Sequence, residues 1–306
     1  MANPHNNTTS DLARQGLLAG IAAYTMWGLF PFYFKATQTV PPAEFVAYRI
    51  VFAVPFGLFI ILFRKQVGDV LKALKNPKTV FLLLFAAVAL AFNWGVYIFA
   101  IQQEQVFQAS LGYYINPLMY VLVGVIFFSE KLSRLQGFAV ILALIGVAIL
   151  TLYGGVFPAI ALILATSFTI YGVIRKYVEI GAMPGLFIET VLLLLPAVFF
   201  LLYLRQSSPL QLELAAPSLK ILILFSGPLT VLPLLAFAFA ARRLRLSTLG
   251  FLQFIGPTLQ FLCGLYFGEA FTFAHAICFG FIWIGVAIFS YDAWSNNRRV
   301  KKTRPQ

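Results

Sequence analysis

Charged residues are scarce in this 306-residue sequence: Asp, Glu, Lys and Arg together make up 10% of it, whereas 61% is hydrophobic. Soluble domains average about a quarter charged residues. A chain with so few polar side chains cannot cover a water-soluble globule. This composition excludes the ordinary soluble classes and predicts a protein embedded in a membrane.

Residues that bind metals or carry out catalysis are also scarce. The two histidines are His5 and His275, and the two cysteines, Cys263 and Cys278, lie inside apolar runs. Such a set provides neither a metal site nor a disulfide framework. The sequence contains no Walker A motif, no HExxH motif and no combination of Ser, His and Asp placed for hydrolysis. We therefore expect no metal, no cofactor and no enzymatic activity.

Long hydrophobic runs, in contrast, are abundant. A bilayer core about 30 Å thick needs about 20 apolar residues in a helix, and uninterrupted runs indicate helices because barrel strands alternate. We predict an all-α membrane protein whose ten transmembrane helices lie at 13–34, 43–63, 79–101, 107–128, 134–152, 156–175, 185–204, 218–240, 247–268 and 273–294.

The formal net charge of +12 is distributed unevenly among the connecting segments. If the N-terminus is cytoplasmic, every Lys and Arg falls on the cytoplasmic side except Lys35, Arg205 and Lys220, and Arg49, which lies within a span. This is the positive-inside pattern, so we predict that both termini are cytoplasmic and that the basic residues face anionic lipid headgroups. The same placement argues against nucleic-acid binding by the RRVKKTR tail.

The two halves of the chain resemble each other. LGYYINPLMYVLVGVIFFSE at 111–130 matches LGFLQFIGPTLQFLCGLYFGE at 249–269, and IGVAI occurs at 145–149 and again at 284–288. We predict two five-helix repeats, 13–152 and 153–294, between an N-terminal tail 1–12 and a basic tail 295–306. Because each repeat has an odd number of spans, the second enters the membrane inverted. Many secondary transporters have this plan, with the substrate near the midplane.

Prolines lie halfway through several spans. Pro117 and Pro257 occur at corresponding places, about 15 Å deep, and Pro228 interrupts the eighth span. A proline there frees a carbonyl and bends the helix, so we predict that these three positions bend or move in gating. Polar residues including Tyr113, Asn116 and Gln253 lie on the same helices. They either line a water-containing cavity or form packing seams between helices.

Arg49 is a charged residue inside the second span, where insertion costs about 3 kcal/mol or more. We predict that it attracts a carboxylate or another anionic group of a substrate. The alternative is a structural ion pair with Glu44, five residues earlier on the same helix. Glu189 occupies the place corresponding to Glu44 in the second half. These two carboxylates are the candidates for ion coupling.

Four stretches carry a resemblance to a known family: AAYTMWGLFPFYFK, EFVAYRIVFAVP, FNWGVYIFAI and SLGYYINPL, in spans one to four. Over 13–294 the chain resembles the RarD group of the EamA-type drug/metabolite transporter superfamily. The resemblance implies a bacterial inner-membrane permease that works by alternating access. The polar intramembrane positions that the resemblance points to in this chain are Trp27, Arg49, Asn93, Trp94, Tyr113, Tyr114 and Asn116. We predict that these residues and Gln253 contact the substrate.

The function predicted from these features is secondary transport, with export of a small amphiphilic metabolite, amino-acid-like compound or drug. The expected partners are the substrate, the lipid bilayer and a proton as coupling ion. A passive pore and a non-transporting receptor or scaffold are the alternatives, although the loops are short for binding a soluble partner.

Overall fold

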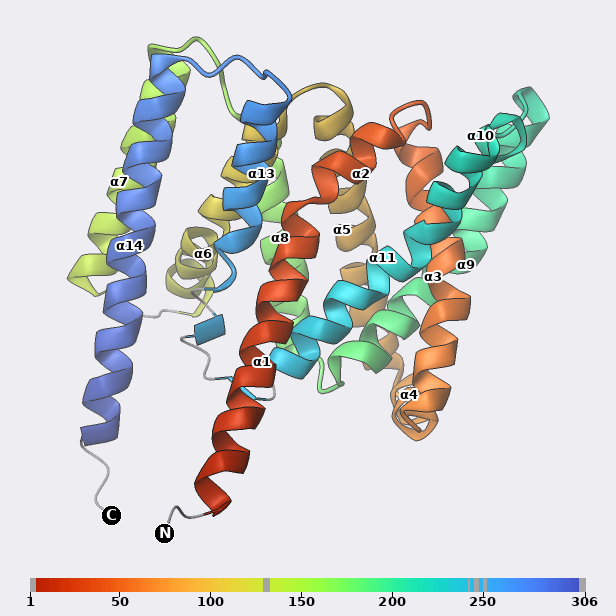
Figure 1. Cartoon of the computed structure of the whole chain (residues 1–306), viewed down its shortest axis with the longest axis horizontal. Coiled ribbons are helices and arrows are strands. Elements are labelled where there is room, and N and C mark those ends of the chain that lie inside the picture. Colours follow the sequence, from red (N-terminus) through yellow and green to blue (C-terminus); the bar gives the residue numbers. More distant parts are fainter. Residues whose placement is uncertain (1–3, 129–132, 242, 245–247, 250–251, 303–306) are drawn as a thin grey trace.

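The chain folds into a bundle of helices, seen here in a computed structural model that describes residues 4–128, 133–241, 243–244, 248–249 and 252–302 (Figure 1). Every regular element within these ranges is helical. In chain order they are α1 (Pro4–Gly28), α2 (Phe30–Ala36), α3 (Pro42–Phe63), α4 (Val67–Leu74), α5 (Pro77–Gln102), α6 (Val106–Phe128), α7 (Arg134–Leu152), α8 (Ala159–Tyr177), α9 (Ala182–Ser207), α10 (Gln211–Leu214), α11 (Pro217–Ala241), α13 (Ile255–Tyr266) and α14 (Phe273–Lys302).

Nine of these helical segments are long and apolar enough to cross a membrane, counting only the described residues and taking α1 and α2 as one span, Arg14–Ala36. They coincide with nine of the ten predicted spans. The other, 247–268, contains α13, which has 12 residues. Part of that predicted span, at 247 and 250–251, lies outside the described residues. Helix also extends into both predicted tails, to Pro4 at one end and Lys302 at the other.

The first span is interrupted between α1 and α2, and the break follows from a proline. Pro31 has no N–H, so the carbonyl of Trp27 has no partner one turn later. That carbonyl instead accepts a hydrogen bond from Gln260 Nε2 of α13, at 3.3 Å. The next carbonyl, of Gly28, accepts a weak bond from Cys263 Sγ at 3.7 Å. The bend is therefore fixed by donors from the other half of the chain.

Helices from the two halves alternate in the packing. α3 packs against α9 and α11, α8 packs against α5 and α6, and α1 packs against α11 and α13. α7 and α14 lie side by side at one edge of the molecule and contact mainly each other (Figure 1). The N- and C-terminal ends lie on the same face, with α4 near that face and α10 at the opposite one.

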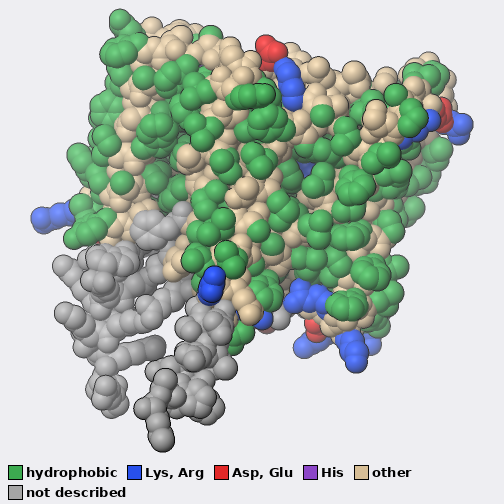
Figure 2. Space-filling model, in the orientation of Figure 1, with side chains coloured by type: hydrophobic (Ala, Val, Ile, Leu, Met, Phe, Trp, Pro, Cys, Tyr) green, Lys and Arg blue, Asp and Glu red, His purple; other side chains and the backbone are tan. Residues whose placement is uncertain are grey.

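The outer surface is what a bilayer requires. Figure 2 shows a broad hydrophobic band, with Lys, Arg, Asp and Glu gathered mostly at its two ends. Large apolar side chains such as Phe63 and Leu152 are 79% and 85% exposed. Exposed apolar surface on this scale marks contact with lipid and not with water. A short helix, α4, follows the second span, and its Val70 and Ala73 are buried against the bundle.

Candidate functional site

Arg49 lies in the interior of the bundle, with only 4% of its surface exposed. Its Nε donates a hydrogen bond to Thr230 Oγ1 of α11 at 3.0 Å. Its guanidinium carbon lies 4.3 Å from the centroid of the Trp94 ring and 5.6 Å from that of Phe34. Aromatic faces attract a cation in this arrangement, most strongly when water is excluded. A hydroxyl from α11 and aromatic rings from α5 and α2 thus surround this arginine of α3.

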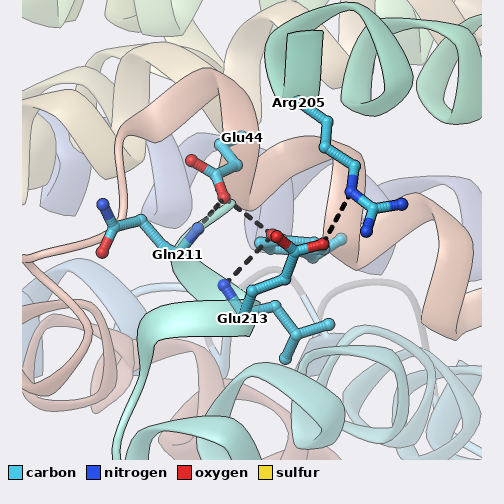
Figure 3. A network of polar contacts seen from close by, with 6 residues as sticks. Glu44, Arg205, Gln211 and Glu213 are labelled. Atoms are coloured by element: carbon cyan, nitrogen blue, oxygen red, sulfur yellow. Dashed lines mark hydrogen bonds and ion pairs between the residues drawn. The ribbon is translucent and has the colours of Figure 1, made fainter. Parts of the chain in front are cut away.

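The alternative role for Arg49, an ion pair with Glu44, does not match the geometry. Glu44 Oε1 accepts hydrogen bonds from Tyr48 Oη and from the backbone N–H of Gln211, both at 2.7 Å. Figure 3 shows Glu44 beside Gln211, while Arg205 reaches Glu213 at 2.9 Å. In the part of the chain that the structure describes, no salt bridge includes Arg49.

Asn93 forms a polar junction next to this arginine. Its Nδ2 donates to Ser167 Oγ at 2.9 Å and to the Leu164 carbonyl at 3.0 Å, both on α8. Its Oδ1 accepts a hydrogen bond from Tyr113 Oη at 3.3 Å. The Tyr113 ring lies 5.7 Å from that of Tyr97, which in turn contacts Phe34 beside Arg49.

The structure thus brings four of the predicted site residues into one cluster. We call this set, with its supporting hydroxyls, the central cluster: Arg49, Asn93, Trp94, Tyr113, Ser167 and Thr230. The first four residues come from the first half of the chain, and the two hydroxyls come from the second.

The other predicted site residues lie in separate contacts. Trp27 packs edge-on against Tyr24, with ring centroids 5.4 Å apart. Tyr114 Oη lies 2.6 Å from Thr258 Oγ1 on α13. Asn116 Oδ1 accepts a hydrogen bond from Thr169 Oγ1 of α8 at 2.8 Å.

Gln253 precedes α13 and is half-buried. Within the described residues it is seen only in a backbone hydrogen bond, from its N–H to the Leu249 carbonyl at 3.0 Å. Substrate binding by Trp27, Tyr114, Asn116 and Gln253 stays a prediction, as it does for the residues of the central cluster.

A glycine determines how closely α11 approaches α3. A Cβ on Gly227 would collide with the backbone of Phe52 and Ala53. One turn later on α11 and one turn earlier on α3, Thr230 meets Arg49. Because backbone atoms cannot move aside as a flexible side chain does, the absence of a side chain at Gly227 is what lets the hydroxyl reach the guanidinium.

Glu189, the second predicted coupling carboxylate, is 1% exposed and forms a buried ion pair. Arg175 Nε lies 3.5 Å from its Oε1, and Tyr171 Oη donates to its Oε2 at 3.4 Å. Oε1 has no hydrogen-bond partner among the described residues. A small cavity between α3, α5 and α9 is lined by both Glu189 and Trp94, so this ion pair is a close neighbour of the central cluster.

A carboxylate also closes the N-terminus of α6. Glu269 accepts the backbone N–H of Phe107 through both oxygens, at 3.0 and 3.2 Å. Gly268, with φ of +77°, supplies the turn that precedes it. Burial raises the pKa of the Glu269 carboxyl to about 7, although the Phe107 N–H favours its charged form. Glu269 thus places a carboxyl group at the N-terminal end of α6, where the dipole of the helix attracts negative charge.

Sequence reasoning missed the partners of the buried charges. Thr230 and Ser167 are hydroxyl residues in apolar spans, yet no local pattern links them to Arg49 or Asn93. Arg175 belongs to the positive-inside count, but its side chain is only 14% exposed. Its position directly after the apolar run ending in Ile174 was the available signal. No group of three metal-ligating side chains is found among the described residues.

Apolar spanning helices around a buried cluster of polar and aromatic side chains define a multi-spanning membrane protein with an internal polar site. The EamA-like transporter family matches residues 14–152. A protein of Vibrio cholerae serotype O1, described as an uncharacterized transporter, is 42% identical over 95% of this chain and 97% of its own length. The RarD protein of Escherichia coli strain K12 is 40% identical over 94% of this chain and 98% of its own.

The chain therefore belongs to the EamA-like transporter family, and within it to the group of RarD proteins. It is a membrane transporter by family. A solved crystal structure also shares the fold, with a TM-score of 0.58 and 21% identity over 89% of this chain and 96% of that one.

Proposed function

We propose that this protein is a secondary transporter that works by alternating access and exports a small amphiphilic molecule through the central cluster. The observation that carries the proposal is the buried Arg49, held by Trp94 of its own half and Thr230 of the other. Polar and charged residues inside a membrane bundle generally mark a substrate or ion pathway. A site shared between the halves is also the one whose access changes when they rock against each other.

Reciprocal packing supports two inverted repeats of five helices. In the α7–α14 pair, Gly146 packs against the backbone of Cys278, and Gly285 packs against the backbone of Ala139. When the two halves of the chain are aligned on their copies of IGVAI and then exchanged, one contact maps onto the other. The order of the contacts along the chain runs in opposite directions on the two helices, as an inverted repeat requires. The family match to 14–152 also coincides with the first proposed repeat, 13–152.

The packing of the remaining helices follows the same exchange. If α1 corresponds to α8, α5 to α11 and α6 to α13, the α1–α11 contact becomes the α8–α5 contact. The α1–α13 contact likewise becomes the α8–α6 contact. Pro117 and Pro228 lie inside α6 and α11, where a bend would let these helices tilt while their ends stay packed. Pro257 lies instead in the first turn of α13, so movement there would take place at the start of that helix.

We propose an orientation with both termini in the cytoplasm of a bacterium and the bundle in its inner membrane. Both termini lie on one face of the molecule (Figure 1), and the basic segment around α4 lies near the same face. The relatives from Vibrio cholerae and Escherichia coli are bacterial proteins that match this chain over nearly its whole length.

For proton coupling, Glu189 is the better of the two predicted carboxylates. Glu44 is held by a backbone N–H at the α10 end of the molecule. Glu189 borders the cavity beside Trp94 and retains an oxygen without a hydrogen-bond donor among the described residues. A proton arriving there would release Arg175, which links protonation to helix movement.

The test is transport by the purified protein in liposomes. A thermal-stability screen against amino acids, organic acids and amphiphilic antibiotics would supply a labelled substrate, since a ligand at ten times its Kd adds about 1.4 kcal/mol. We expect saturable uptake that is accelerated by unlabelled substrate inside the vesicles. Flux that rises linearly with concentration and shows no such counterflow would indicate a pore and contradict the proposal.

A further inference from the structure

We infer that the substrate is a monocarboxylate on an apolar or aromatic body, and that its carboxylate binds end-on to the two terminal guanidinium nitrogens of Arg49. This inference rests on the proposed function and specifies its substrate class. It is carried by three features of the described structure: an uncompensated charge, a guanidinium with one free edge, and walls made of aromatic rings.

The first feature is the balance of charge. Other cations near carboxylates are neutralised in pairs: Lys35 with Glu104 at 2.7 Å, and Arg175 with Glu189 at 3.5 Å. Glu44 is turned toward the backbone of Gln211. Arg49 is more deeply buried than these cations but has no carboxylate partner among the described residues. A buried charge is costly unless it is paired, so the site favours a ligand that brings the missing negative charge.

The second feature is the direction in which Arg49 can still donate. Its Nε is engaged by Thr230 Oγ1, which itself donates to the Ser226 carbonyl at 2.7 Å and is thus held in place. One face of the guanidinium is covered by Trp94. The two terminal nitrogens have no hydrogen-bond acceptor among the described residues, and their parallel N–H groups match the two oxygens of a carboxylate.

The third feature is the set of aromatic rings around Arg49. Phe30 and Phe34 lie 5.9 and 5.6 Å from the guanidinium carbon, measured to the ring centroids, and Tyr97 and Tyr113 continue this surface. Rings of this kind accommodate an apolar body. One cation neutralises one anion, so a dicarboxylate would bury a second, unpaired charge. The site should therefore prefer monocarboxylates to dicarboxylates.

The test compares ligands of one shape on the wild-type protein, so that it does not depend on a variant. The probes are 3-phenylpropionate, its amide 3-phenylpropionamide, and the dicarboxylate phenylsuccinate, each titrated against the purified protein in nanodiscs. We expect the monocarboxylate to bind about 10- to 100-fold more tightly than the amide, the range of a charge-assisted hydrogen-bonded pair. Equal affinities for the acid and the amide, or no binding of the acid, would overturn the inference.

Two variants then assign the effect to one residue. Arg49→Met should reduce the affinity for the acid to that for the amide, whereas Arg205→Met, which removes an exposed arginine paired with Glu213, should leave both affinities unchanged. Retention of the preference for the acid by Arg49→Met would also overturn the inference. Saturable counterflow of a neutral substrate that persists in Arg49→Met would refute the substrate class while leaving the transporter proposal intact.

Discussion

Arg49, which is buried, and Arg175, which is partly buried, have opposite electrostatic situations. Arg175 lies against Glu189 and donates to the Gly181 carbonyl at 3.4 Å. Arg49 has a hydroxyl and aromatic rings around it but no carboxylate among the described residues. A charge whose partner is inside the protein stabilises that partner. A charge whose partner is absent costs stability until a ligand arrives.

This contrast predicts opposite effects of the same substitution. Arg175→Met leaves Glu189 buried without its cation and should lower the stability of the protein by about 3–5 kcal/mol. Arg49→Met replaces an unpaired buried charge by an apolar side chain of similar length, and Thr230 keeps its bond to Ser226. We expect unchanged or higher stability for Arg49→Met, measured as the thermal midpoint without ligand. A large loss would mean that Arg49 mainly holds the helices together.

At the level of single residues, the sequence identified which polar groups lie inside the membrane but not what they touch. Arg49 and Asn93 are conspicuous because their neighbours in the sequence are apolar. Their partners, Thr230 and Ser167, lie 181 and 74 residues away, and only the packing of the helices brings them near. The alternative role for Arg49, a pair with Glu44, is wrong for the same reason. Glu44 accepts a hydrogen bond from the backbone N–H of Gln211, which is 167 residues away in the sequence.

Among the helices, the approach of α11 to α3 is the most sensitive to a small change. Gly227→Ala should push the two helices apart, because the added methyl group meets the backbone of Phe52, and it should cost about 1–3 kcal/mol. It should also weaken ligand binding at Arg49 by moving Thr230.

Gly280→Ala in α14 is the matched control, since a Cβ there meets nothing within 4 Å. Removing the flexibility of a helical glycine should leave stability equal or raise it by up to about 1 kcal/mol. Thermal denaturation of both variants measures the difference. Equal effects at the two glycines would show that close packing at Gly227 is not important.

The N-terminus of α6 should make stability depend on pH. The pKa of Glu269 is raised by burial to about 7 in the folded protein, above the value of 4.5 for an unperturbed carboxyl. Between these values the folded state holds a proton that the unfolded state releases, so stability should fall as pH rises from 4.5 to 7. Above pH 7 both states are ionised and this contribution is constant.

Thermal midpoints between pH 4.5 and 8 test this expectation. Glu269→Gln keeps an oxygen that can accept from Phe107 but cannot titrate, so the fall within this window should become smaller. An unchanged pH profile in Glu269→Gln would assign the dependence to another group.

Helix positions were predictable from the sequence, but helix interruptions were only partly so. Apolar runs of the right length define the spans. Pro31 marks a break in the first span, yet its consequence depends on Gln260 and Cys263 of α13, which supply donors to the freed carbonyls. A proline thus predicts a bend, but the hydrogen bonds from the neighbouring helix determine the geometry of that bend.

For the whole molecule, the two cysteines offer a simple test of orientation. Cys263 and Cys278 are 3% and 0% exposed, so the wild-type chain should react little with thiol reagents. We expect Gln206→Cys, at the exposed end of α9, to be labelled in spheroplasts by a maleimide that cannot cross membranes. Ala2→Cys should be labelled only after the membrane is permeabilised. The reverse pattern would place both termini outside the cytoplasm.

The all-helical, multi-spanning architecture was accessible from composition and periodicity, because in lipid a chain has few ways to satisfy its backbone. The tenth span and the inverted repeats stay predictions. The sequence repeat also suggested which helices correspond. It did not reveal that α7 and α14 form a pair at one edge, or that the polar groups of the first half find their partners in the second. Such contacts depend on how the two halves fit together, which no local pattern encodes.

The long separation of these contacts has a consequence for biosynthesis. During translation the first half enters the membrane with Arg49 lacking Thr230 and with the α6 N-terminus lacking Glu269, which follows Phe107 by 162 residues. Until the ribosome has made the second half, the nascent chain carries a cation and an open helix end within or beside lipid. A product that stops near residue 152 would expose both to the insertion machinery and to membrane proteases. Cells should therefore degrade the isolated first half much faster than the complete chain.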